Sequence, residues 1–124
     1  MKALNIILVD DNNHFRNSAI NFINNNLNFK LITWASSSEE AMGKILNYNF
    51  DLVILDLVMN GLNGFETTKK IRSFDKNIKI IITTLSNNTE YKKQSLAAGA
   101  NEFISKQNFA EQLLPAINKI FYND

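Results

Sequence analysis

Polar residues that could act together stand directly after short apolar runs of this sequence. Asp10 and Asp11 follow one run, Asp56 follows another, Thr84 ends a third, and Lys106 follows a weaker one. Three carboxylates brought together would repel one another by roughly 4 kcal/mol per pair, at a separation of about 4 Å and an effective dielectric constant of about 20. Such a cluster requires a compensating cation.

The residue types in this set indicate a metal ion and an anion. Carboxylate oxygens without histidine or cysteine select a hard ion, and an incomplete set that leaves room for water and phosphate favours Mg²⁺. Mg²⁺ and the ammonium group of Lys106 together would neutralise the oxygens of a phosphoryl group in transfer. Asp56 could then act as the nucleophile. The predicted chemistry is phosphoryl transfer to a carboxylate.

Five apolar segments are predicted to be strands that carry these residues. Four are rich in Ile, Val and Leu and do not alternate with polar residues, which is typical of strands buried on both faces. A fifth is weaker. The predicted strands are Leu4 to Val9, Phe29 to Trp34, Leu52 to Leu55, Ile78 to Thr84 and Glu102 to Ser105.

Helical spacing of apolar residues fills the segments between the strands. Ser37 and Glu40 form a capping box before one helix, Gly99 is placed like a helix C-cap, and Pro115 should kink or delay the last helix. We also expect Trp34 in the core and His14, the single histidine, on a helix surface. The predicted buried stripes are Phe15, Ala19, Phe22 and Ile23; Ala41, Ile45 and Leu46; Phe65, Thr68 and Ile71; Tyr91, Leu96 and Ala97; and Phe109, Leu113, Ile117 and Ile120.

The alternation of strand and helix predicts an α/β fold in one domain over residues 1–124. Right-handed crossovers give a doubly wound, flavodoxin-like parallel sheet of five strands in the order 2-1-3-4-5, with five helices on its two faces. Ligands of such sheets bind outside the carboxyl ends of the strands. Taken singly, each of the polar residues above reads as a turn, capping or surface residue; their joint placement at one rim indicates a site.

Composition excludes several classes of protein. Thirteen Lys and Arg against twelve Asp and Glu leave a net charge of +1, which gives no general electrostatic basis for binding nucleic acid or an acidic membrane. There is no cysteine for disulfides, thiolate metal sites or thiol nucleophiles. No apolar run is long enough for a membrane span, and the amino-terminal run ends in two aspartates, unlike a signal peptide.

Four segments resemble bacterial response-regulator receiver domains in the order in which that family has them. They are ILVDDN, LVILDLVMNGLNG, IIITTLS and AAGANEFISK. Thr84 stands fifteen positions before Gly99, the spacing at which the family has its hydroxyl residue. The resemblance implies that Asp56 is the phosphoacceptor, that Asp10, Asp11, Asp56 and the backbone carbonyl of Val58 hold Mg²⁺, that Lys106 contacts the phosphoryl group, and that Thr84 and Phe103 form a switch.

The sequence departs from the family pattern at three positions. Asn60 stands where many relatives have proline, Leu85 replaces a small residue after the threonine, and Gln107 replaces a proline, often cis, after the lysine. We expect Leu85 to narrow access to Asp56 and to slow phosphorylation by small donors. The loop after Lys106 should differ in shape from that of relatives with the cis-proline.

The resemblance implies a cytoplasmic receiver that takes a phosphoryl group from a histidine kinase or phosphotransfer protein. It would not be an enzyme in the usual sense, because it catalyses only its own phosphorylation and dephosphorylation. The face made by the fourth helix, fifth strand and fifth helix would then control a partner, a homodimer contact, or a DNA-binding output domain outside this chain that regulates transcription. This domain itself would bind neither nucleic acid nor membrane.

Two other functions remain open from the residues. One is a docking receiver that works without phosphorylation. The other is a Mg²⁺-dependent aspartyl phosphohydrolase, which would need a second aspartate where Val58 stands. A nucleotide- or flavin-binding module is disfavoured, because acidic Asp10 and Asp11 occupy the place of its phosphate loop.

Overall fold

Five parallel strands form the main sheet of the computed structural model, which describes residues 3–27, 30–59, 62–86 and 88–122. The spatial order β2-β1-β3-β6-β7 confirms the predicted flavodoxin-like order 2-1-3-4-5. The predicted strand limits agree to within one residue, with Phe29 outside the described residues. The strands are β1 (Leu4–Val9), β2 (Lys30–Ala35), β3 (Leu52–Asp56), β6 (Lys79–Thr84) and β7 (Glu102–Ser105).

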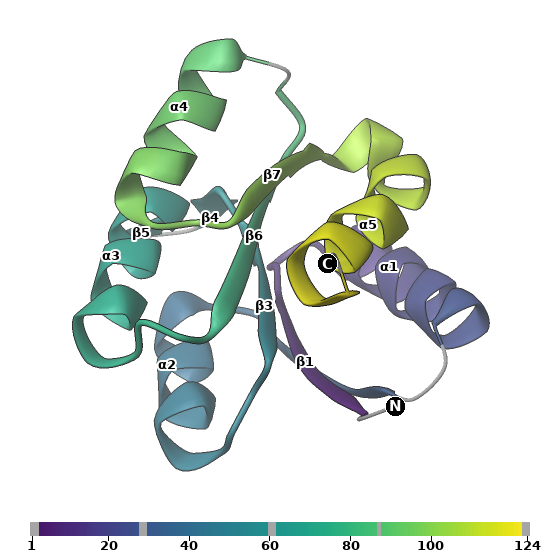
Figure 1. The fold of residues 1–124 in the computed structure, drawn as a ribbon, viewed down its shortest axis with the longest axis horizontal. Helices are drawn as coiled ribbons and strands as arrows, with labels where there is room; N and C mark the ends of the chain where they lie inside the picture. The colour runs from purple at the N-terminus through teal and green to yellow at the C-terminus, as the bar shows by residue number, and fades with distance from the viewer. Residues whose placement is uncertain (1–2, 28–29, 60–61, 87, 123–124) are drawn as a thin grey trace.

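Helices cover both faces of the sheet (Figure 1). α1 (Asn13–Asn26) and α5 (Phe109–Ile117) lie on one face, and α2 (Ser38–Asn47), α3 (Gly64–Phe74) and α4 (Thr89–Ala98) lie on the other. This confirms the predicted five helices. Within the described part of the chain, none of the helices has the length and apolar character to cross a membrane.

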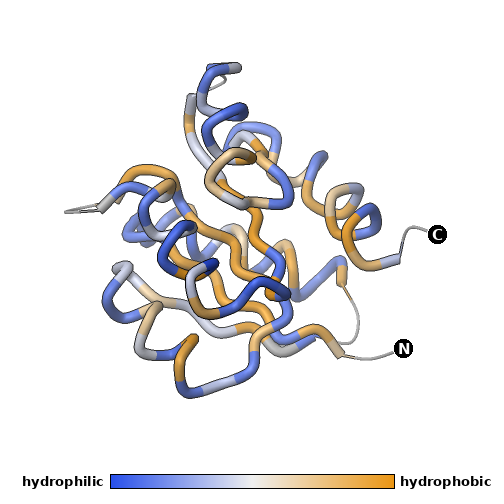
Figure 2. The backbone as a smooth tube through the Cα atoms, turned by 60° about the vertical axis from the view of Figure 1, so that its left-hand side comes forward, coloured by the Kyte–Doolittle hydropathy of each residue, from blue (hydrophilic) through white to orange (hydrophobic). Residues whose placement is uncertain are grey.

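The strands supply the apolar centre of both layers, as Figure 2 shows by their orange colour between bluer helices. Ile6 and Leu8 of β1 pack with the α1 and α5 side, whereas Ile7 and Val9 pack with the α2, α3 and α4 side. Because both faces are covered, successive side chains of one strand are buried, as all five residues of β3 are. This explains the continuous apolar runs in the sequence.

Short polar side chains begin four of the helices. The N-caps Asn12, Ser37, Asn63 and Asn88 each accept a hydrogen bond from a backbone N–H of the first turn. The predicted capping box is present with one change: Glu40 accepts from the backbone N–H of Ser36 at 2.7 Å, one residue before the predicted partner. Asparagine N-caps therefore fix where several of the helices begin.

The predicted C-cap at Gly99 is confirmed. Its φ of +116° lies in the left-handed region, and its N–H donates to the carbonyl of Leu96. A Cβ added at this position would lie 2.8 Å from Cγ of Arg72, whose Nε donates to the Gly99 carbonyl at 2.9 Å. Glycine is therefore required both by the backbone and by its neighbour.

Four residues assigned to the core are exposed instead. Leu46 lies one position beyond the buried Ile45, so the helical turn points it toward solvent. Helix α4 buries the small residues Ser95 and Ala98, whereas Leu96 and Ala97 lie on the exposed side of the helix. Trp34 is 44% exposed because β2 is an edge strand, with a neighbouring strand on one side only.

Two local features differ from a regular alternation of strand and helix. A short antiparallel hairpin of β4 (Val58–Met59) and β5 (Leu62–Asn63), not predicted from the sequence, follows β3 directly. Helix α5 continues through Pro115 and then becomes a π-helical turn, Asn118–Tyr122. Pro115 has no N–H to donate to the carbonyl one turn earlier. The π-helical turn begins shortly after this predicted site of strain.

Candidate functional site

Three carboxylates meet at the carboxyl ends of two neighbouring strands. Asp10 and Asp11 follow β1, and Asp56 is the last residue of β3. One carboxylate oxygen from each of the three lies within 4.8 Å of the others. Asp10 and Asp56 are buried, whereas Asp11 is exposed. The structure therefore brings together the three acids that the sequence placed at one rim, with one side open to solvent.

Lys106 reaches this cluster from a strand at the edge of the sheet. It follows β7 and opens a short 3₁₀ turn (Lys106–Asn108), yet its Nζ lies 2.7 Å from Oδ2 of Asp10 and 3.3 Å from Oδ2 of Asp56. Its side chain is 8% exposed. The ammonium also lies 4.6 Å from the centroid of the Phe15 ring, whose negative face stabilises a cation. One buried lysine thus joins both acids.

Backbone contacts hold Asp10 on several sides. Its N–H donates to the carbonyl of Ala35 at 3.0 Å, and its Oδ1 accepts from the N–H of Asn12 at 2.8 Å. Oδ2 is buried and accepts no hydrogen bond from the described residues, and its partner is the ammonium of Lys106 in an ion pair of 2.7 Å. This buried carboxylate oxygen therefore depends on the charge of Lys106.

The second buried acid, Asp56, is poorly compensated. Burial, and after it the charge of Asp10, together raise the pKa of Asp56 to about 6, although Lys106 opposes the rise. Its Oδ1 accepts a long hydrogen bond, 3.4 Å, from the N–H of Val58. A further cation beside this carboxylate would stabilise its charged form.

These observations fit a hard divalent cation. The two buried carboxylates, Asp10 and Asp56, share the ammonium of Lys106. The candidate ligands are all oxygen atoms, one of them is buried and accepts no hydrogen bond from the described residues, and Asp11 is exposed. Mg²⁺ is held in this way by a few carboxylates together with water and phosphate oxygens. Asp10, Asp11 and Asp56 could hold it.

The remaining predicted site residues lie around the acids without forming one contact network. Thr84 ends β6, one residue after Thr83, the pairing partner of Asp56, and its hydroxyl accepts from the N–H of Ser86 at 3.3 Å. Phe103 is half-buried on β7 and packs with the α2, α3 and α4 side of the core. Val58 begins the hairpin after Asp56, with its side chain 67% exposed.

The departures from the family pattern have different structural results. Asn60 lies outside the described residues. Leu85 is 69% exposed immediately after Thr84, where it flanks the rim. Gln107 follows a trans peptide bond, and its N–H donates to Oγ of Ser105 at 3.2 Å, which a proline could not do. This hydrogen bond contributes to the conformation of the loop after Lys106.

Sequence reasoning missed two residues that support the site. Arg16 is 7% exposed and donates to the backbone carbonyl of Asp10 at 2.8 Å. Its spacing before Ala19 and Ile23 puts it on the buried stripe of α1, and an arginine at such a position could have been noticed. Gly64 is the other, because a Cβ there would lie 3.1 Å from the Asp56 carbonyl. Nothing in the sequence alone indicates that approach.

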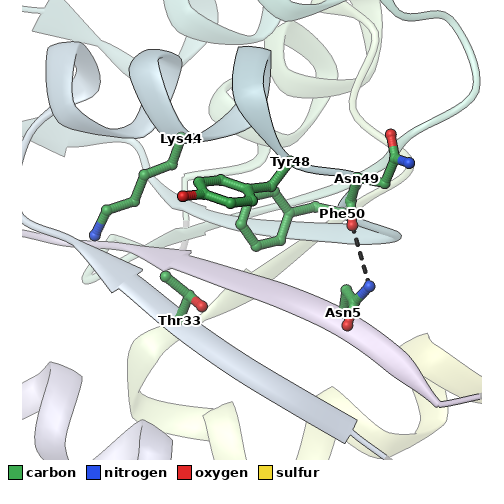
Figure 3. A pocket seen from close by; sticks show the side chains of 6 residues that line it. All are labelled: Asn5, Thr33, Lys44, Tyr48, Asn49 and Phe50. Carbon is green, nitrogen blue, oxygen red and sulfur yellow. Dashed lines mark hydrogen bonds between the residues drawn. The ribbon is translucent and has the colours of Figure 1, made fainter.

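A second concavity lies away from the acids (Figure 3). This cleft of about 520 Å³ is open to solvent between α2 and strands β1 and β2. The carbonyl of Asn49 accepts from Nδ2 of Asn5 at 3.1 Å across one end of the cleft. Its other lining residues are Thr33, Lys44, Tyr48 and Phe50. It contains none of the predicted site residues.

Comparison with known proteins agrees with this architecture. The family model described as the response regulator receiver domain matches residues 6–118. The chain is 30% identical over 118 residues to the chemotaxis protein CheY of Halobacterium salinarum, covering 95% of this chain and 97% of that protein. It is 28% identical to the Fimbriae Z protein of Salmonella typhimurium, covering 97% of this chain and 57% of that protein.

Solved structures agree as well. A two-component response regulator of the LuxR family from Aurantimonas superposes with a TM-score of 0.88 at 27% identity, covering 96% of this chain and 85% of that one. The chain spans about half the length of several curated relatives that it matches, Fimbriae Z among them. With a family model that covers most of its length and the matching fold, the chain belongs to the response regulator receiver domains of two-component systems.

Proposed function

We propose that this domain accepts a phosphoryl group on Asp56 from a histidine kinase or a phosphotransfer protein, with Mg²⁺ held by Asp10, Asp11, Asp56 and the carbonyl of Val58. The observation that carries the proposal is the approach of three carboxylates within 4.8 Å, with Lys106 3.3 Å from Asp56. A bound Mg²⁺ would supply positive charge for the phosphoryl oxygens.

Asp56 is the nucleophile in this proposal. A carboxylate oxygen attacks the phosphorus of a phosphohistidine, the P–O bond forms as the P–N bond breaks, and the electron pair of the broken bond stays on the imidazole. The ammonium of Lys106, already 3.3 Å from Asp56, neutralises charge on the transferred group. Lys106 needs only a small movement, because the 3₁₀ turn and the Phe15 ring already hold it at the site.

The product is an acyl phosphate that water later removes. Water attacks the phosphorus, the bond to Asp56 breaks, and inorganic phosphate leaves as the carboxylate is restored. Leu85 and Val58 are exposed and follow the ends of β6 and β3, so we infer that their side chains limit the approach of water and of small donors to Asp56. The domain turns over only its own phosphoryl group, and we do not assign it a separate substrate.

The acyl phosphate would act as a switch. Thr84 and Phe103 belong to neighbouring strands, and the pairing of Thr84 with Ser105 puts Phe103 two residues earlier on the same face. Movement of the Thr84 hydroxyl toward the phosphoryl group would leave the Ser86 N–H and open space for Phe103 to repack. The face made by α4, β7 and α5 would change with it, acting in the cytoplasm on a partner, a second copy, or a DNA-binding output domain.

Intact-protein mass spectrometry with a small phosphodonor and Mg²⁺ tests the proposal. Wild type should gain one phosphoryl group, and Asp56→Ala should gain none. Asp75→Asn, at the C-cap of α3 away from the site, is the control and should label as wild type does. Labelling of Asp56→Ala at the wild-type level would refute the assignment. Absence of labelling with every donor and kinase would favour the phosphorylation-independent docking receiver.

A further inference from the structure

Arg16 is a buried cation that contacts no carboxylate among the described residues. Its Nη1 donates to the backbone carbonyl of Asp10 at 2.8 Å, and its Nη2 donates to Oδ1 of Asn13. Its guanidinium carbon lies 4.0 Å from the centroid of the Trp34 ring. A carbonyl, an amide oxygen and an indole face thus replace water around a side chain that is 7% exposed.

These contacts of Arg16 stabilise the turn that carries the acidic residues. A guanidinium group presents its donors in a rigid planar fork, so two acceptors held by it are fixed relative to each other. The acceptors here belong to Asp10 and Asn13, the residues on either side of the turn that contains Asp11. With the Asp10 N–H bound to Ala35, the backbone of Asp10 is held at both its donor and its acceptor.

Trp34 completes the arrangement from the edge of the sheet. It pairs in register with Leu8, two residues before Asp10, so its ring lies on the α1 side beside Arg16. Nζ of Lys44, from α2, lies 5.8 Å from the ring centroid and donates to the Trp34 carbonyl at 2.7 Å. The ring therefore has cations from both α1 and α2 near it although Trp34 is 44% exposed.

We propose that Arg16, held against Trp34, is a positioning residue for the divalent-cation site, and that Trp34 reports occupancy of that site through Arg16. The inference rests on the proposed function for the identity of the cation. It concerns residues outside the carboxylate cluster, which contact the acidic turn through its backbone.

Charge and geometry make opposite predictions for Arg16, which makes the proposal testable. A positive charge near the acids repels Mg²⁺, so loss of the charge alone would tighten binding. Loss of the two guanidinium hydrogen bonds would leave the turn less rigid and weaken Mg²⁺ binding, as removal of groups that orient metal ligands does. Arg16→Lys keeps the charge and loses the fork, and Arg16→Met loses both.

Calorimetric titration of the full chain with Mg²⁺ is the first measurement. We expect Arg16→Lys to weaken Mg²⁺ binding by about tenfold, the lower end of the effect for orienting groups around metal ligands. Arg16→Met should also weaken binding, but by less, because loss of the charge offsets part of the effect. Tighter binding by Arg16→Met with unchanged binding by Arg16→Lys would show that only charge matters, and would overturn the proposal. Unchanged binding by both variants would overturn it as well.

Variants at Trp34 keep the test valid if the Arg16 variants fail to fold. Trp34→Leu removes the aromatic face at an exposed position and should weaken Mg²⁺ binding several-fold, whereas Trp34→Phe should restore binding close to wild type. Phe74→Leu is the matched control, because Phe74 is also 44% exposed and belongs to α3. Equal Mg²⁺ affinity in Trp34→Leu, Trp34→Phe and wild type would contradict the proposal.

Fluorescence gives a readout that is independent of phosphorylation, because Trp34 is the single tryptophan. Its emission should change with added Mg²⁺ at the calorimetric midpoint in wild type, and this change should be lost in Arg16→Met. A wild type that binds Mg²⁺ with constant Trp34 emission would overturn the reporting role. Mg²⁺ binding without labelling of Asp56 would refute the proposed function and leave the positioning role intact, and absence of Mg²⁺ binding would refute both.

Discussion

Lys106 Nζ lies 2.7 Å from Oδ2 of Asp10, although strands β3 and β6 separate the two strands that carry these residues. The same ammonium is 3.3 Å from Asp56. In this arrangement the lysine balances part of the charge that a metal ion would otherwise balance. Cation binding and phosphoryl binding therefore place opposite demands on the same side chain.

Replacement of Lys106 should have opposite effects on Mg²⁺ binding and on phosphoryl transfer. Lys106→Met removes a positive charge beside the acids, so Mg²⁺ should bind several-fold more tightly by calorimetry. Phosphoryl incorporation at saturating Mg²⁺ should fall by roughly 10²-fold, because a charged donor to the transferred group is lost. Lys119→Met is the control, since Lys119 pairs with Glu102 on the surface. Weaker Mg²⁺ binding by Lys106→Met would contradict this account of the site.

The raised pKa of Asp56 predicts a pH dependence of stability in metal-free buffer. The folded pKa of about 6 exceeds the ordinary 3.8, so the folded state holds a proton that the unfolded chain has released between about pH 4 and pH 6. Stability should therefore fall as the pH rises through this range. Asp56→Asn removes the penalty and should be more stable than wild type at pH 8, by on the order of 2 kcal/mol.

Urea denaturation in EDTA at several pH values measures this difference. Wild type and Asp56→Asn should converge as the pH falls below about 4, where the carboxyl becomes neutral in both the folded and the unfolded state. Added Mg²⁺ should stabilise wild type at pH 8 more than it stabilises Asp56→Asn, since the variant loses one charged ligand. A constant difference from pH 4 to pH 8 would show that Asp56 does not titrate as proposed.

Leu85 should limit phosphorylation by small donors. Its side chain is 69% exposed directly after Thr84, so its truncation opens the rim without leaving a cavity in the core. Leu85→Ala should be labelled faster than wild type by acetyl phosphate at equal Mg²⁺ concentration. Leu96→Ala, which shortens an exposed leucine of α4, serves as the control. A Leu85→Ala labelling rate no higher than that of wild type would exclude the gating role.

Gly64 should be required by the backbone at the end of β3. A Cβ at this position would lie 2.8 Å from Cα of Leu57 and 3.1 Å from the carbonyl of Asp56, and backbone cannot yield as a flexible side chain can. Gly64→Ala should cost about 1–3 kcal/mol of unfolding free energy and slow the labelling of Asp56.

Gly43→Ala is the matched control for this substitution. Gly43 lies inside α2 with nothing within 4 Å of an added Cβ, so alanine should stabilise the domain by about 0.5–1 kcal/mol through helix propensity. Chemical denaturation measures both variants. Equal stability of Gly64→Ala and wild type would show that the Asp56–Leu57 backbone relaxes freely.

Local patterns in the sequence determined the fold and the main members of the site. The buried apolar runs indicate strands, the stripes and caps indicate helices, and right-handed crossovers leave few topologies. Asp10, Asp11, Asp56, Thr84 and Lys106 could be placed at one rim because parallel strands end on the same side. Periodicity failed for Leu96 and Trp34, because it describes a residue relative to its own element and not the neighbours that cover it.

Only the tertiary structure decided which groups touch at that rim. The contact of Lys106 with Asp10, the pKa of Asp56 and the fork of Arg16 on the acidic turn each depend on distances between elements remote in the chain. The same holds for Gly64, which meets the backbone of Asp56 and Leu57 by close packing. The sequence determines the residue types and the order of the elements. Charge interactions and steric contacts depend on distances that differ by a few ångströms, and only the packing of the elements sets these distances.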